Sequence, residues 1–145
     1  MKKLVMALLF CILTVGMASV ASAAENRWQY LASNNRSVLF FDTQSFQKTG
    51  ATTYSVLIQV EYSEAESLSM AEAININTPV AFELSKDEYN FHNKTSRFLA
   101  STYYDKNGNV LRTDLATTEW TTIPPNSIGE FIFNATYDYY KKNYN

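Results

Sequence analysis

The sequence predicts an α+β fold, a mainly antiparallel sheet of about six strands with one C-terminal α-helix packed across it. Three observations support this prediction. The 145-residue chain holds 10 Tyr and 9 Phe against 4 Gly and 3 Pro, a composition that favours strands. Apolar and polar residues alternate along several segments separated by turn sequences, and the period becomes helical near the C-terminus.

The first 23 residues have the pattern of an export signal. Two lysines precede an apolar run at residues 4–15, and Ala21-Ser22-Ala23 offers a small-x-small cleavage site. The run is shorter than the roughly 20 residues of a membrane-spanning helix. We therefore expect Sec-dependent export, removal of residues 1–23, and one domain over residues 24–145 without an integral membrane segment. Its location would be the periplasm, the cell surface or the medium.

Charge and cysteine content narrow the classes of function. Cleavage leaves 10 of the 12 basic residues against all 14 acidic ones, a net charge of −4. Nucleic-acid binders carry basic stripes, so we expect no nucleic-acid partner. Cys11 lies inside the signal, and Phe10 stands before it where lipid attachment needs a small residue. We therefore expect a mature chain without lipid or disulfides, held together by packing.

The N-terminal half predicts a hairpin followed by a long strand. Trp28–Ala32 and Val38–Phe41 are predicted strands, joined by a polar turn at residues 33–36. Asp42–Lys48 is expected to form one short helical turn. In Tyr54–Tyr62, aromatic and branched residues alternate with Ser, Gln and Glu, which is typical of a half-buried strand.

The middle of the chain predicts a short helix and a second hairpin. Ser63–Ala73 is rich in Glu and indicates an acidic helix or an ordered loop. Val80–Phe91 and Arg97–Tyr104 are predicted strands. The turn Asp105-Lys106-Asn107-Gly108 follows, and Asn-Gly between apolar runs favours a hairpin because both residues tolerate positive φ. The sheet should therefore be mainly antiparallel.

The C-terminal segment predicts an amphipathic helix. Ser127 and Glu130 have the spacing of a capping box, so a helix should begin there. One apolar stripe consists of Ile128, Phe131, Ile132, Ala135 and Tyr139. A second stripe, facing roughly the other way, consists of Phe133, Tyr137 and Tyr140. The second stripe needs cover, either from a homodimer or another partner, or from the chain's own strands.

Residues typical of catalysis or metal binding do not form a convincing pattern. His92 lies in a polar turn, and no nucleophile elbow is present. A Ser-x-x-Lys motif and a Lys-Thr-Gly motif share the single lysine Lys48, so that match is due to chance. A calcium loop starting at Asp105 would need Gly and Glu where Val and Ala stand. Four Glu residues between positions 61 and 72 are expected to be a solvated face, with a cation or a basic partner as the alternative. We predict no enzyme activity and no cofactor.

Several motifs occur in order along nearly the whole mature chain. They are Trp28-Gln29-Tyr30-Leu31, Phe40-Phe41-Asp42-Thr43-Gln44-Ser45, Ser101 to Val110 with Tyr-Asp-Lys-Asn-Gly, Trp120, and Pro125-Asn126-Ser127-Ile128-Gly129-Glu130 with Phe133-Asn134-Ala135. Together they resemble the small exported bacterial proteins grouped with surface-adhesin protein E. The resemblance implies an antiparallel sheet with a C-terminal helix across it, and an extracytoplasmic adhesin that binds host matrix proteins.

The same resemblance implies one specific contact. Members of that family often carry two cysteines able to form a disulfide, at places that match Phe91 and Tyr137 here. A disulfide needs Cα atoms within roughly 7 Å. If this chain has the same backbone as those members, the rings of Phe91 and Tyr137 should be in contact, so that packing replaces the disulfide.

These observations together predict a non-enzymatic extracytoplasmic binding module for a protein partner or host matrix protein. Because aromatic residues dominate binding hot spots, the candidate partner-binding residues are Phe133, Tyr137, Tyr140, Tyr103 and Tyr104. A periplasmic structural or inhibitor-like subunit is the alternative function, and a homodimer is an open alternative for the oligomeric state.

Overall fold

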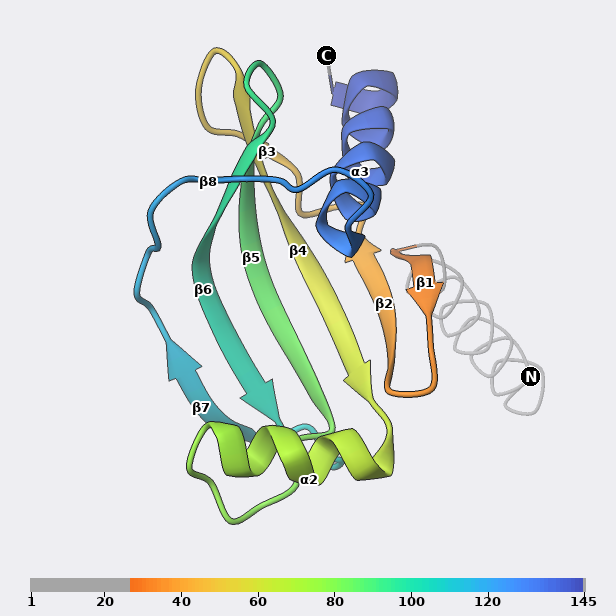
Figure 1. Ribbon diagram of the computed structural model, residues 1–145, viewed down its shortest axis with the longest axis vertical. Helices are drawn as coiled ribbons and strands as arrows, with labels where there is room; N and C mark the ends of the chain where they lie inside the picture. Colours follow the sequence, from red (N-terminus) through yellow and green to blue (C-terminus); the bar gives the residue numbers. More distant parts are fainter. Residues whose placement is uncertain (1–26, 145) are drawn as a thin grey trace, which may run out of the picture.

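An antiparallel sheet carries both helices of the described chain in a computed structural model of the protein (Figure 1). The structure describes residues 27–144, so the predicted signal lies outside the described residues. The elements are β1 (Trp28–Ser33), β2 (Ser37–Asp42), β3 (Gln47–Lys48), β4 (Thr53–Tyr62), α2 (Glu64–Ala73), β5 (Phe82–Asn90), β6 (Thr95–Tyr104), β7 (Val110–Asp114), β8 (Thr121–Thr122) and α3 (Ile128–Tyr144).

The strand order is β1-β2-β4-β5-β6-β7, and every pairing is antiparallel. The two-residue strands β3 and β8 pair with β4 and β6 respectively. In Figure 1, α3 lies against one end of the sheet with its axis roughly along the strands, and α2 runs across the other end. The predicted fold class is confirmed. We call the sheet face that packs against α3 the helix face, and the other the opposite face.

Side chains in the turns explain why both predicted hairpins form. Asn34 Oδ1 accepts hydrogen bonds from the backbone N–H groups of Arg36 and Ser37, which closes the β1–β2 turn. Asp105 Oδ1 accepts from the N–H groups of Asn107 and Asn109 in the same way. Gly108 adopts a φ of 80°, a backbone conformation that favours glycine. Local sequence therefore fixes these turns.

Both helices begin after a serine cap, which was predicted for Ser127 but not for Ser63. Ser63 caps α2, and its side chain accepts from the N–H of Glu66, so the acidic segment is a helix. Ser127 Oγ accepts from the N–H of Glu130 at 3.1 Å. Glu130 reaches back to the N–H of Asn126 at 2.7 Å, one residue earlier than an ideal capping box.

The predicted helical turn at residues 42–48 is wrong. A hydrogen-bonded turn at residues 43–44 leads instead into β3, which pairs with β4. Ser45 Oγ donates to the backbone carbonyl of Asp42 and accepts from the N–H of Leu57, each at 2.8 Å. This bridge holds the segment alongside β4, so it does not coil.

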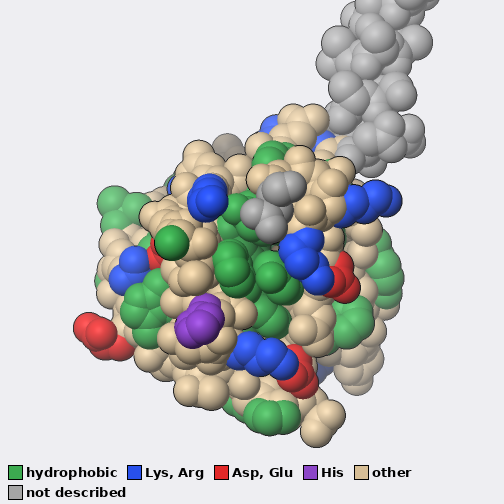
Figure 2. Space-filling model, turned by 90° about the horizontal axis from the view of Figure 1, so that it is seen from above, with side chains coloured by type: hydrophobic (Ala, Val, Ile, Leu, Met, Phe, Trp, Pro, Cys, Tyr) green, Lys and Arg blue, Asp and Glu red, His purple; other side chains and the backbone are tan. Residues whose placement is uncertain are grey.

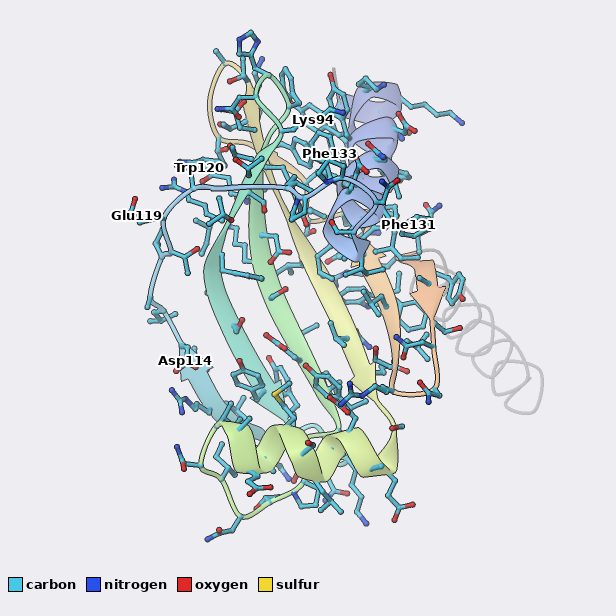
Figure 3. All side chains as sticks on the ribbon, in the orientation of Figure 1. Lys94, Asp114, Glu119, Trp120, Phe131 and Phe133 are labelled. Carbon is cyan, nitrogen blue, oxygen red and sulfur yellow. The ribbon has the colours of Figure 1, made fainter. Side chains whose placement is uncertain are left out.

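The buried side of α3 carries Phe133 and Tyr140 of the second stripe, whereas two residues of the first stripe are exposed. Phe133, Thr136 and Tyr140 are buried, whereas Ile128 is 58% exposed and Phe131 48% exposed. Figure 3 shows Phe133 and Phe131 on different sides of the helix. Thr136 occupies the centre of the buried face, where its hydroxyl donates to the carbonyls of its own helix and also shares a hydrogen bond with Tyr54 of β4. Hydrophobic periodicity does not count such an arrangement.

An aromatic cluster forms the core between α3 and the sheet. Tyr54 of β4 is fully buried, stacks on Tyr140 with ring centroids 4.7 Å apart, and shares a hydrogen bond of 3.0 Å with Thr136. The rings of Phe91 and Tyr137 stack at 5.1 Å and 15°, which confirms the contact expected from the family resemblance. Figure 2 shows apolar side chains gathered at this end of the molecule, beside the single histidine.

Candidate functional site

Three of the predicted partner-binding residues belong to α3 and are largely covered. Phe133 and Tyr140 are each 2% exposed and pack on the sheet. Tyr137 is half-buried, stacks on Phe133 and Phe91, and has Lys141 Nζ 4.5 Å from its ring centroid. The chain's own strands therefore provide the cover that the second stripe needs, which is one of the two alternatives left open by the sequence.

The other two predicted residues are neighbours on β6 and therefore project to opposite faces of the sheet. Tyr104 stacks on Phe82 with ring centroids 4.6 Å apart on the opposite face. Tyr103 pairs in register with Glu83 on the helix face and lines a hollow there. The structure does not bring the five predicted residues together, and Tyr103 is the one that lines a concave surface.

The motif at residues 40–45 holds the fold together. Asp42 is fully buried and accepts from Nε and Nη2 of Arg27 at 3.0 and 2.6 Å and from the N–H of Gln44 at 2.9 Å. Tyr144, near the end of α3, donates to the carbonyl of Thr43 at 2.7 Å. These bonds connect the start of β1, the end of β2 and the end of α3. A structural role therefore accounts for this motif.

Trp120, another motif residue, also has a structural role. The Arg97 guanidinium lies 4.6 Å from the Trp120 ring centroid, and Arg97 Nε donates to Glu88 Oε2 at 2.6 Å. Glu88 is buried, so the ion pair also neutralises a carboxylate in the sheet. The contacts anchor the segment between β7 and α3 on β6.

One surface cavity of the described chain lies between α2 and the β6–β7 turn. It measures about 490 Å³ and is lined by residues that include Ser67, Leu68, Pro79 and Asp105. Leu68 is exposed and supplies apolar surface. The Asp105 carboxylate is already used inside its own turn, because it accepts from two backbone N–H groups and from the Asn109 side chain. These bonds lower the pKa of Asp105. Glu64 and Lys106 also line this cavity, so it mixes apolar contact with charges of both signs and does not define one ligand chemistry.

The second cavity, which we call the acidic hollow, lies on the helix face between β5, β6, the end of β7 and residues 116–118. Its volume is about 260 Å³. Figure 3 shows Asp114 at the end of β7 that leads into this segment. The lining residues are Glu83, Phe98, Ala100, Ser101, Tyr103, Asp114, Ala116 and Thr118.

Two carboxylates converge on Tyr103 in the acidic hollow. The pKa of the Tyr103 hydroxyl is raised, first by burial and then by the negative charges of Glu83 and Asp114. Glu83 accepts a hydrogen bond from the Tyr62 hydroxyl at 2.7 Å. Asp114 accepts from Arg112 Nε at 2.7 Å, and both side chains of that ion pair are well exposed. The hollow therefore presents negative charge beside aromatic rings.

Asp87 adds an unusual buried acid next to this hollow. It is 8% exposed and pairs in register with Phe98, so its side chain projects from the same face of the sheet as that ring. Its Oδ2 accepts from the Tyr89 hydroxyl at 3.1 Å, whereas Oδ1 has no hydrogen-bond partner. Burial raises the pKa of Asp87 to about 6, against the opposing influence of the Ser85 and Tyr89 hydroxyls.

Sequence reasoning missed Glu83, Asp87 and Phe98. The available signal was the segment Phe82-Glu83-Leu84-Ser85-Lys86-Asp87-Glu88, in which charged residues occur inside a strand that has a neighbour on each side. Within residues 27–144, no three His, Cys, Asp or Glu side chains gather closely enough to hold a metal ion. Neither α2 nor α3 is sufficiently long and apolar to cross a membrane.

Comparison with known families decides the relationship of the chain. Residues 28–136 match the family described as surface-adhesin protein E, from the first strand into the C-terminal helix. The chain belongs to the surface-adhesin protein E family. It matches none of the curated proteins and none of the solved structures with which it was compared. The resemblance seen in the sequence motifs is thereby confirmed, and membership implies a non-enzymatic adhesin at the level of the family.

Proposed function

We propose that this surface-adhesin protein E family member is a non-enzymatic extracytoplasmic binding module that contacts a host or surface macromolecule. Family membership supports the general class. The observation that supports binding most directly is the acidic hollow, where Phe98 is 53% exposed beside the carboxylates of Glu83 and Asp114. Exposed aromatic rings next to charged groups are typical of protein-binding surfaces.

Other exposed apolar residues extend the surface available to a partner. Tyr30 on β1 and Phe131 on α3 are also exposed. When a partner covers large apolar side chains, their removal from water contributes roughly 25 cal/mol of favourable binding free energy per Å² of buried apolar area. The described surface therefore offers several apolar anchors in addition to the hollow.

Surface labelling of intact bacteria tests the location on which this function depends. Cells expressing the full chain with a C-terminal epitope would be treated with a membrane-impermeant amine reagent, and permeabilised cells would provide the control. Lys141 and Lys142 are exposed and provide amines for the reagent. We expect labelling of the protein in intact cells. Labelling only after permeabilisation would refute the adhesin and favour a periplasmic structural or inhibitor-like subunit.

A further inference from the structure

The size of the acidic hollow suits one side chain of a partner. Its volume of about 260 Å³ lies below the roughly 300 to 1,000 Å³ of pockets that enclose drug-sized ligands. It is nevertheless equivalent to several water molecules at about 30 Å³ each. A single extended side chain inserted from a protein surface fits this volume better than a free metabolite does.

The lining of the hollow favours a positive charge on that side chain. Glu83 and Asp114 contribute carboxylates, and the negative charge of each raises the pKa of Tyr103. Arg112 pairs with Asp114 and opposes this effect, so Glu83 supplies the negative charge that no cation of the described chain pairs with. Phe98 contributes a half-exposed ring on the same rim. A cation is attracted to the face of an aromatic ring and to carboxylates, so the two features select the same ligand chemistry.

Asp87 provides an independent indication of the same charge. This carboxyl group is more than nine-tenths buried, and its Oδ1 lacks a hydrogen-bond partner. The other oxygen accepts from the Tyr89 hydroxyl, but a buried carboxylate that is bound only by neutral groups remains unfavourable unless an opposite charge approaches. Because Asp87 lies directly opposite Phe98 in register, a cation held at that ring would supply the missing charge.

We infer that the acidic hollow is a binding site for a cationic side chain, lysine or arginine, of the partner protein. Glu83 and Phe98 make the direct contacts, and the Asp87 carboxylate, opposite Phe98 in register, adds to the local negative potential. The inference rests on the proposed function, since it names the chemistry of the partner that the module binds.

Fluorescence anisotropy with labelled oligolysine and oligoarginine peptides, each at several salt concentrations, tests this site on the purified mature chain. Glu83→Gln removes one carboxylate, and Phe98→Leu keeps apolar bulk while removing the ring. Glu61→Gln is the matched control, because Glu61 is exposed on the opposite face and the charge change is identical to that of Glu83→Gln. Circular dichroism and thermal unfolding confirm that each variant is folded.

We expect Glu83→Gln and Phe98→Leu each to weaken binding of at least one peptide by about threefold or more. The control should stay close to the wild type, and a neutral oligoglutamine peptide should not bind. The peptide that loses more affinity on Phe98→Leu identifies the preferred cation. Should Glu83→Gln fail to fold, the Phe98→Leu result decides the question, because that side chain is half-exposed.

Equal weakening by Glu61→Gln and Glu83→Gln would overturn the inference, since it would show attraction to the overall acidic surface. Absence of binding, or binding unaffected by Phe98→Leu, would also overturn it. These outcomes are separate from surface labelling. Labelled intact cells combined with a failed peptide experiment refute only the hollow, whereas protected cells refute the adhesin function whatever the peptides do.

Discussion

Replacing Asp87 with Asn should remove a pH-dependent loss of stability from the protein. Burial raises the pKa of Asp87 from 3.8 to about 6 in the folded state. The folded state therefore holds this proton more tightly than the unfolded state, and its free energy of unfolding falls as the pH rises from about 4 through 6. A pKa difference of this size corresponds to about 3 kcal/mol of unfolding free energy, and most of this stabilisation is lost by about pH 7.

The assay is urea-induced unfolding of the wild type and of Asp87→Asn at several pH values between about 4 and 8. The Asn side-chain oxygen can still accept from the Tyr89 hydroxyl, so the existing hydrogen bond is kept. We expect the stability of the variant relative to the wild type to rise by up to about 3 kcal/mol across this range. A difference that stays constant with pH would refute the assignment of a raised pKa to this group.

Three further predictions concern packing, the structural motif and export. Phe91→Ala and Tyr137→Ala should destabilise non-additively, with a coupling of about 1 kcal/mol in a double-mutant cycle of urea unfolding, and additivity would contradict the ring contact. Asp42→Ala should cost at least about 2 kcal/mol of unfolding free energy, because it removes a fully buried carboxylate that accepts three hydrogen bonds, two of them from the charged Arg27, and a neutral effect would contradict a structural motif. The intact mass of the exported protein should correspond to a chain that begins at Ala24. A mass that shows a lipid on Cys11 would contradict removal of the signal.

Local signals in the sequence predicted the elements whose geometry they determine. The Asn-Gly turn before Val110 and the Ser127 cap of α3 act through hydrogen bonds to residues a few positions away. Such contacts depend little on the rest of the fold, so the hairpins and the start of α3 could be predicted directly. The strand Tyr54–Tyr62 was predicted because its alternation reflects the burial of one face.

Features that depend on distant contacts were missed or assigned to the wrong residues. Thr136 is polar in any periodicity count, yet it lies at the centre of the buried face because Tyr54, 82 residues away, shares a hydrogen bond with it. The predicted helical turn after Asp42 failed for a similar reason, since the N–H of Leu57 binds Ser45.

The candidate site shows the same limit. Asp87 and Phe98 become neighbours only through the β5–β6 register, which shifts between Lys86 and Asp87. Moving a strand by one residue reverses which face each side chain occupies, so spacing alone could not place these residues together. Family motifs did not identify them either, because the motif residues Asp42 and Trp120 serve the fold.

Direct binding of the purified mature chain to immobilised extracellular matrix proteins tests the central claim, that this family member binds macromolecules outside the cytoplasm. Surface plasmon resonance would compare the wild type with the heat-unfolded chain over the same matrix preparations. We expect saturable binding by the folded chain to at least one preparation, and loss of that binding on unfolding. Absence of saturable binding to every preparation, together with a folded protein, would contradict the claim that the chain is an adhesin.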